Sequence, residues 1–195
     1  MEKNTVFQFV CFDTSFGYDE FIPQWENFAE KFLSNRASAI SLNKLEANKN
    51  KFRYVSKNEW PSDDFQFVFQ KGKISEKFSA GQVKVTLAGG YSPVQIEYAK
   101  KTGKGDVKVL AFVNDQRTEL EFYRTLKPYR HLNIYEAYYE NSLFRYVLEF
   151  FVKEQDAATI IDQLKKQSIQ IETGIYRECV AEHSAAPAKH QTAKI

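Results

Sequence analysis

The sequence predicts a soluble α+β fold in which two consecutive βαββαβ modules pack their antiparallel sheets together within one chain. Three observations support this fold class. Strand-like runs and runs with a helical period follow one another in the same order twice. Each half contains two extended runs around a short polar segment, which is typical of an antiparallel hairpin. The tetrapeptide Phe-Arg-Tyr-Val recurs near the start of the second hairpin strand in both halves.

The first module begins with a short run of β-branched and aromatic residues, which favours a strand. Apolar residues then recur every three or four positions from Phe21 to Phe32 and predict an amphipathic helix with Pro23 in its first turn. Gly89 and Gly90 are expected to end the last strand. In chain order, the expected elements are a strand at 5–13, the helix, hairpin strands at 39–46 and 51–57, a helix capped by Ser62 and a strand at 83–88.

The second module repeats this pattern. Thr118 and Glu121 have the spacing of a capping box, and Asp156 is suited to cap a later helix. In chain order, the expected elements are a strand at 107–113, a helix from Thr118 to Leu126, hairpin strands at 132–139 and 143–152, a helix after Asp156 and a strand at 169–180. The domain boundaries that follow are a first module at 1–96, a linker at 97–106, a second module at 107–180 and a disordered tail at 181–195.

The composition argues against several classes of function. A formal net charge of +2, without a long basic block, disfavours a nucleic-acid partner. No segment holds the roughly 20 apolar residues of a membrane span, and the start of the chain lacks the apolar stretch of a signal peptide. We therefore expect a cytoplasmic protein with no membrane partner. Cys11 and Cys179 share no ligand spacing, and the chain has no phosphate loop, nucleophile elbow or dinucleotide fingerprint, so we expect neither a metal site nor a cofactor.

A strand, helix, hairpin, helix and strand in this order form the ferredoxin-like motif, whose sheet needs a partner on the face that its helices leave uncovered. Two such modules in one chain resemble the dimeric α+β barrel superfamily. The strand from Phe52-Arg53-Tyr54-Val55 to Trp60, and the later Gly89-Gly90-Tyr91, look like parts of an antibiotic-biosynthesis-monooxygenase-type domain. The resemblance implies an intrachain α+β barrel with a ligand pocket. Members of the superfamily include cofactor-independent oxygenases of phenols and quinols, haem-degrading proteins and many proteins without an assigned activity.

The catalytic candidates are Trp60, Tyr54 and His131. Oxygenases of this type use an Asn on the first strand, a Trp on the hairpin and a nearby His or Arg. This chain offers Gln8, Trp60 and no His before His131, so it departs from the family pattern at two of three places. Trp60 could stack on a flat substrate or only pack over the strand-to-helix corner before Pro61. His131 could accept a phenolic proton or simply be exposed where a strand starts.

The ligand-binding candidates come from the strands and include Gln8. Arg53 and Arg145 could hold an anionic ligand through paired donors, or lie in solvent. Tyr146 matches Tyr54, and in each Arg–Tyr pair one side chain is expected to face the helices. Polar residues of the first hairpin strands become candidates only if they point inward, because unpaired burial is costly; these are Asn43, Glu46, Tyr135, Glu136 and Tyr138.

Two functions stay open at this point. The first is a small-molecule-binding or structural protein of the dimeric α+β barrel type, with a ring-rich core and self-association into a homo-oligomer. The second is a cofactor-independent monooxygenase that acts on a small aromatic, phenol-like or quinol-like substrate. The second function requires Trp60, Tyr54 and His131 to converge on one buried site.

Overall fold

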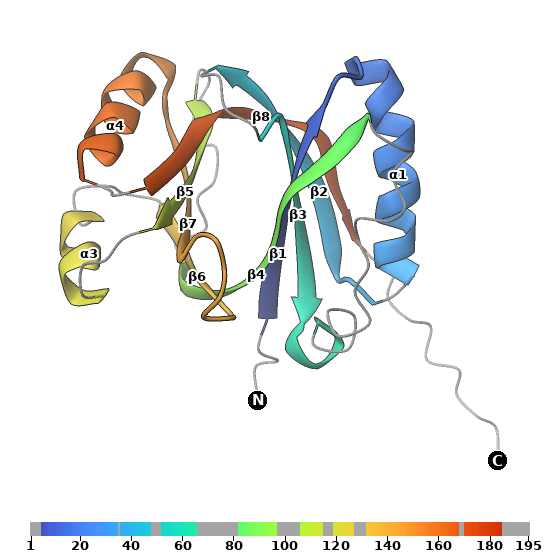
Figure 1. Cartoon of the computed structure of the whole chain (residues 1–195), viewed down its shortest axis with the longest axis horizontal. Coiled ribbons are helices and arrows are strands. Elements are labelled where there is room, and N and C mark those ends of the chain that lie inside the picture. Colours follow the sequence, from blue (N-terminus) through green and yellow to red (C-terminus); the bar gives the residue numbers. More distant parts are fainter. Residues whose placement is uncertain are drawn as a thin grey trace.

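The computed structural model describes residues 5–34, 36–47, 52–65, 82–96, 106–114, 119–126, 132–167 and 170–184. In these ranges eight antiparallel strands form a closed barrel, and helices pack on its outside (Figure 1). The elements are β1 (Thr5–Thr14), α1 (Tyr18–Ser34), β2 (Ala39–Ala47), β3 (Tyr54–Pro61), β4 (Val83–Ile96), β5 (Asp106–Asn114), α3 (Glu119–Leu126), β6 (Leu132–Ala137), β7 (Tyr146–Lys153), α4 (Glu154–Gln167) and β8 (Gln170–Ser184). The predicted α+β class with antiparallel strands is confirmed.

The barrel is completed within one chain. Neighbouring strands follow the order β1-β3-β2-β8-β5-β7-β6-β4, and β4 pairs with β1 to close the circle. The strands of each half are therefore contiguous, and the halves join where β2 pairs with β8 and β4 pairs with β6. Helix α1 covers the outside of the first half, and α3 and α4 cover the second (Figure 1). Since each described strand has two neighbours, closure leaves none of them at an open edge.

Helix α1 shows how the sequence produces this outer layer. The backbone N–H of Gly17 donates to Glu20 Oε2 at 2.9 Å just before the helix. Asp19 and Glu20 in the first turn and Lys31 in the last turn complement the helix dipole. The residues that the helix buries are spaced by one, three or four positions and are Phe21, Trp25, Phe28, Ala29 and Phe32. The helix therefore presents an almost entirely aromatic face to the sheet.

Among the described residues, three hydrophobic clusters make up the core. The α1 cluster lies between α1 and the outside of the first-half strands, and it contains Val6, Val10, Phe12, Phe21, Trp25, Phe28, Ala29, Phe32, Ala37, Ile40, Leu42, Tyr54, Trp60, Phe65 and Val83. A second cluster lies under α3 and α4. The barrel cluster has no helix residue and contains Phe9, Cys11, Phe52, Val55, Leu87, Tyr91, Leu110, Phe112, Tyr135, Phe144, Val147 and Tyr176. Because its rings meet across the two halves, this cluster fills the inside of the barrel.

The repeated tetrapeptide occupies the same place in both halves. Tyr54 and Tyr146 are the first residues of β3 and β7. Each stacks on a helix ring, with centroids 4.3 Å apart for Tyr54 on Phe21 and 4.3 Å apart for Tyr146 on Phe122. The carbonyls of the two arginines that precede them accept backbone hydrogen bonds from the ends of β2 and β6, at 2.9 and 2.8 Å. Both tyrosines therefore face the helices.

The two glycines that were expected to end a strand lie inside β4, which continues to Ile96. A Cβ atom at Gly90 would overlap the ring of Phe65, and one at Gly89 would lie 2.9 Å from Cε2 of Tyr91. The expected strand end is therefore wrong. The glycines make room for neighbouring rings, and a pattern of residue types does not distinguish this use of glycine from a turn.

Other boundaries also differ from the sequence prediction. Helix α1 begins at Tyr18, so Pro23 lies beyond its first turn. Strand β3 runs to Pro61, beyond the expected end at 57, and residues 62–65 are helical, so Trp60 lies next to the strand-to-helix corner and packs near Phe65. Strand β8 continues to Ser184, into the segment expected to be a tail. Of the expected linker at 97–106, only Asp106 is described, and it is the first residue of β5.

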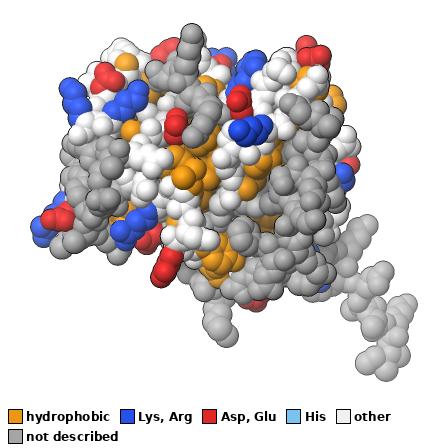
Figure 2. All heavy atoms as spheres, viewed as in Figure 1, with side chains coloured by type: hydrophobic (Ala, Val, Ile, Leu, Met, Phe, Trp, Pro, Cys, Tyr) orange, Lys and Arg blue, Asp and Glu red, His pale blue; other side chains and the backbone are white. Residues whose placement is uncertain are grey.

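On the face drawn in Figure 2, charged side chains of one sign do not gather into a patch. There the coloured Lys and Arg side chains are mixed with Asp and Glu, and apolar side chains gather near the centre. Within the described helices, none is both long and apolar enough to cross a membrane.

Candidate functional site

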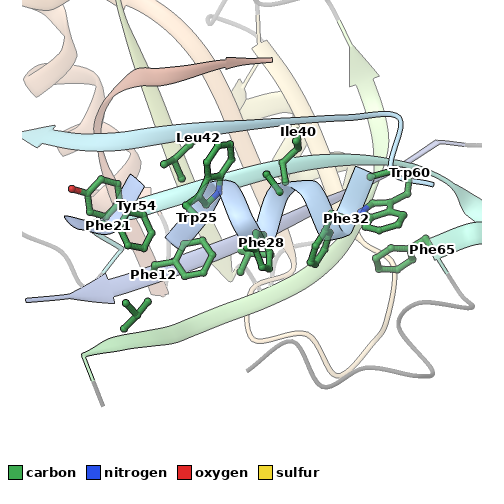
Figure 3. Close-up of a cluster of buried hydrophobic side chains, with 14 of the residues drawn as sticks. Phe12, Phe21, Trp25, Phe28, Phe32, Ile40, Leu42, Tyr54, Trp60 and Phe65 are labelled. Carbon is green, nitrogen blue, oxygen red and sulfur yellow. The ribbon is translucent and has the colours of Figure 1, made fainter. Parts of the chain in front are cut away.

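Trp60 and Tyr54, two of the three catalytic candidates, face the same side of β3 but lie far apart. They are six residues apart in one strand, which corresponds to about 20 Å. Figure 3 shows them at opposite ends of a row of phenylalanine rings that includes Phe28. Both side chains are fully buried in the α1 cluster. The structure therefore does not bring them together, and His131 lies outside the described residues.

Gln8 and Trp60 meet in a polar network beneath α1. The Trp60 Nε1–H donates to Gln8 Oε1 at 3.2 Å, and Asn58 Nδ2 donates to the same oxygen at 3.1 Å. Ser56 Oγ in turn donates to Asn58 Oδ1 at 2.7 Å. The register of β1 and β3 explains the contact, because Gln8 pairs with Asn58. These side chains are buried, so the network orders the core under α1.

Two buried polar atoms of the α1 cluster, Tyr54 Oη and Trp25 Nε1, meet no hydrogen-bond partner among the described residues. Burial raises the pKa of Tyr54 above its ordinary value. A buried polar group without a partner costs about 1–3 kcal/mol. Tyr54 is thus held by ring stacking on Phe21 instead of by its hydroxyl.

The two arginine candidates each make a contact within their own half. Arg53 Nη1 donates to the carbonyl oxygen of Thr14 at 2.7 Å. Arg145 donates from Nε and Nη2 to Glu136 Oε1 at 3.3 and 3.2 Å. Arg145 and Glu136 are partly exposed, so this pair contributes little to stability. The structure does not join the arginines into one anion-binding clamp.

Asn43 points into the barrel and leads to a group of charges that the sequence did not suggest as a site. Its Nδ2 donates to the carbonyl of Val55 at 3.3 Å, and its Oδ1 accepts from Lys108 Nζ at 2.9 Å. We call the group that begins here the barrel charge cluster; its members are Asn43, Lys57, Lys108, Asn133, Tyr135 and Glu149. They come from β2, β3, β5, β6 and β7.

Glu149 is the centre of the barrel charge cluster. Its Oε2 accepts from Lys57 Nζ at 2.7 Å, Tyr135 Oη at 2.8 Å and Asn133 Nδ2 at 3.1 Å. Its Oε1 lies 3.4 Å from Lys108 Nζ. Lys57 Nζ also donates to Tyr135 Oη at 2.8 Å. One carboxylate therefore holds two ammonium groups that come from different halves of the chain.

Lys57 and Glu149 occupy equivalent positions in the two halves. Each lies two residues after the valine of its tetrapeptide. Lys57 pairs with Phe9 and Ser41, and Glu149 pairs with Leu110 and Asn133 in the matching strands. Two identical subunits would place the same residue at both positions. Within one chain the two positions can carry opposite charges, which makes this ion pair between the halves feasible.

The electrostatics of the cluster favour an ionised Glu149 and a protonated Tyr135. Burial by itself raises the pKa of Glu149, but the charges of Lys57 and Lys108 and the hydrogen bonds outweigh burial and hold this pKa well below its usual range. Burial and the adjacent carboxylate raise the pKa of Tyr135 well above its ordinary value. Glu149 is therefore a poor general base near neutral pH, and Tyr135 acts as a hydrogen-bond donor.

Lys57 is the most exposed of the three charged residues of the cluster. Its side chain is 21% exposed, whereas those of Lys108 and Glu149 are 9% and 5% exposed. The Lys57 ammonium lies 5.0 Å from the ring centroid of Phe7 and 5.1 Å from that of Tyr135. The arrangement combines an accessible cation with aromatic walls, which suits binding of a small molecule better than proton transfer.

The sequence contained a weak signal for this site. Tyr135 and Asn43 were candidates if they pointed inward, and they do. Lys108 and Glu149 are charged residues with apolar neighbours on both sides within their strands, and such a residue on a buried face needs a partner. Sequence reasoning missed both, and it missed Lys57, because a strand pattern does not show which residues meet across a barrel. Within the described ranges, no three His, Cys, Asp or Glu side chains are grouped as metal ligands.

Comparison with known proteins supports the fold. No protein-family model and no curated protein sequence matches the chain. A proposed monooxygenase from Fusobacterium nucleatum subsp. nucleatum ATCC 25586 is 13% identical, with a TM-score of 0.57 over 94% of this chain and 96% of that one. An anthrone oxidase-like protein is 10% identical, with a TM-score of 0.58 over 95% and 94%.

A chlorite dismutase mutant from Candidatus Nitrospira defluvii, crystallised with cyanide, is 10% identical, with a TM-score of 0.53 over 91% of this chain and 92% of that one. The similarities extend along nearly the whole of both chains in each case. They confirm the expected dimeric α+β barrel fold. At these identities they establish the fold alone.

Proposed function

We propose that this protein binds a small aromatic molecule at the end of the barrel where Lys57 is accessible. The observation that carries the proposal is the barrel charge cluster, in which Glu149 and Lys108 are almost fully buried among rings. Buried ion pairs often stabilise a fold no better than apolar residues of the same volume. Charged groups held in such surroundings are concentrated at functional sites.

The rings near the two lysines support an aromatic ligand. Phe7 and Phe151 are only partly buried, and they lie 5.0 Å and 5.5 Å from the ammonium groups of Lys57 and Lys108. A ligand ring next to Lys57 would extend the contacts that these side chains already make. Polar groups that fix orientation among aromatic walls are typical of small-molecule sites.

We also propose that the chain consists of two fused ferredoxin-like modules at 1–96 and 107–180, joined by a linker at 97–106. The strand orders β4-β1-β3-β2 and β8-β5-β7-β6 support this division. Strand β8 ends at Ser184, and residues 185–195 of the expected tail lie outside the described residues. Because the fused halves carry different side chains at equivalent positions, one chain would hold one ligand site. Self-association into a homo-oligomer is part of the same proposal.

The experiment that tests ligand binding is native mass spectrometry of the protein purified from its own host. We expect one retained small molecule in each chain and a subunit count above one. Lys57→Gln should lose the molecule, whereas Lys84→Gln should keep it, because Lys84 is an exposed lysine on β4. Retention by Lys57→Gln at the wild-type level would place the ligand elsewhere. If the wild-type protein retains no ligand and also binds no aromatic probe, the ligand-binding proposal is rejected and a structural role remains.

The second candidate function is a cofactor-independent monooxygenase acting on a phenol-like or quinol-like substrate. It is favoured by the names of two similar structures, the proposed monooxygenase and the anthrone oxidase-like protein. Trp60 and His131 are its proposed catalytic residues, with Gln8 as a proposed ligand contact beside Trp60. Tyr54 lies about 20 Å from Trp60 along β3, and Tyr146 packs on Phe122 in the other half, so neither shares a site with Trp60. Oxygen uptake with anthrone tests it. Uptake that Trp60→Phe abolishes would support this function, and uptake no faster than without protein would reject anthrone oxidation.

A further inference from the structure

Resting on the ligand site proposed above, we infer that the ligand is an aromatic monoanion, either an aryl carboxylate or an ionised phenol, whose negative oxygen lies against Lys57 and Lys108. The proposed function gives the ligand an aromatic ring, and this inference adds a negatively charged oxygen attached to that ring. It comes from the hydrogen-bonding capacity of the barrel charge cluster, from the position of the two lysines on one carboxylate and from the rings beside them.

The first step concerns donors that the cluster leaves unused. An ammonium group carries three N–H donors. Among the described residues, Lys57 Nζ donates to Tyr135 and Glu149, and Lys108 Nζ contacts Asn43 and Glu149. Each lysine therefore has one donor left for a further acceptor. Oε2 of Glu149 already accepts three hydrogen bonds, and Oε1 faces Lys108 at 3.4 Å.

The second step concerns the sign of the charge that fits. Two ammonium groups share one buried carboxylate, so the three charges together leave an excess of positive charge. The charge of Glu59 also raises the pKa of Tyr135, so this carboxylate offsets part of the excess. A negatively charged oxygen at the two unused donors would form charge-assisted hydrogen bonds, which are stronger than those to a neutral oxygen.

The third step concerns the shape of the ligand. Phe7 lies beside Lys57, and Phe151 lies beside Lys108. The Phe7 ring also contacts the Tyr135 ring edge-on, with centroids 5.0 Å apart. The donors are thus flanked by partly buried rings from two strands, β1 and β7. A flat ring attached directly to the anionic group can reach both the donors and these rings, whereas an aliphatic anion such as acetate would add no ring contact to those already present.

The test compares matched probes by isothermal titration calorimetry. Benzoate and 4-nitrophenolate carry the charge on a carboxylate and on a phenol, and benzamide has the ring without the charge. We expect wild-type protein to bind at least one of the two anions at least about tenfold more tightly than benzamide. Which anion binds more tightly distinguishes the two sources of charge. This comparison needs no variant, so it decides the question even if a substitution disturbs folding.

Variants then locate the interaction. Lys57→Gln should weaken the bound anion about ten- to a hundredfold and leave benzamide within about twofold, because only the charged donor is lost. Glu149 keeps Lys108, Tyr135 and Asn133 in this variant, so the fold should be retained. Lys84→Gln, which makes the same chemical change on the exposed side of β4, should leave all three affinities unchanged.

Each outcome has a definite meaning. Equal binding of benzamide and both anions, lost from all three in Phe7→Ala, would overturn the charge inference and keep the aromatic site. Equal weakening of the anions by Lys57→Gln and Lys84→Gln would also overturn the inference, since the charge would then act only at long range. Failure of all three probes, together with no molecule retained in native mass spectrometry, would overturn both the inference and the proposed function.

Discussion

Replacing Glu149 with Gln removes the carboxylate that Lys57 and Lys108 share. Gln has the same shape and can still accept hydrogen bonds, so the change isolates the charge. Breaking a buried ion pair by removing one partner costs about 3–5 kcal/mol, because the remaining charge is left uncompensated. Here two ammonium groups lose their counter-ion. We therefore expect the free energy of unfolding to fall by an amount near the upper end of this range. The partial exposure of Lys57 reduces the cost, because water solvates its charge.

The assay is urea unfolding at pH 7, followed by tryptophan fluorescence and circular dichroism. The matched control is Glu136→Gln, which makes the same change in a pair with Arg145 whose side chains are 31% and 41% exposed. This control should cost no more than about 1 kcal/mol. Adding Lys57→Gln to Glu149→Gln should recover part of the loss, because one of the two uncompensated charges is removed. Equal losses for the two Glu→Gln variants would refute the reasoning.

The same pair gives a pH prediction. The pKa of Glu149 in the folded chain lies below the ordinary value of 4.5, because the lysines outweigh burial. As pH falls below about 4.5, the unfolded chain binds a proton that the folded chain still excludes, so stability is lost progressively. Glu149→Gln has no such group. The difference in unfolding free energy between wild type and Glu149→Gln should therefore be constant above this pH and shrink below it, and a difference that grows on acidification would contradict the assignment.

Three further substitutions, with Gly17→Ala as a control for the first, test the packing. Gly90→Ala should lower the free energy of unfolding by about 1–3 kcal/mol, because the new Cβ overlaps the buried ring of Phe65. Gly17→Ala should cost under about 1 kcal/mol, because a Cβ there would make an ordinary contact at 3.4 Å. Thermal unfolding compares the two variants. Tyr54→Phe should change the unfolding free energy by less than about 1 kcal/mol or raise it, since the hydroxyl meets no partner among the described residues. A loss above about 2 kcal/mol in urea unfolding would show that the hydroxyl makes a hydrogen bond. Trp60→Phe should cost about 1–3 kcal/mol in the same assay through the lost bond to Gln8 and the lost volume, and no loss would contradict the network beneath α1.

The order of elements was predictable because it depends on local chemistry. Apolar residues at a helical period, such as those of α1, and alternating runs bounded by polar segments determine where helices and strands form. The repeated tetrapeptide was also informative, since Tyr54 and Tyr146 begin equivalent strands. The structural role of Gly89 and Gly90 was not predictable, because glycine occurs both in turns and where a ring packs closely on the backbone. Only the position of Phe65 in the folded chain decides between these roles.

By itself, the sequence determined that this protein is an α+β chain with antiparallel hairpins, a ring-rich core and two similar halves. These properties follow from residue periodicity and composition, which act over a few residues at a time. Only the tertiary structure decided that Trp60 is buried under α1 and that Lys57, Lys108 and Glu149 meet inside the barrel. Lys57 and Glu149 are separated by 92 residues. Their contact depends on how the two halves close into one barrel, and no local pattern in the sequence encodes that pairing.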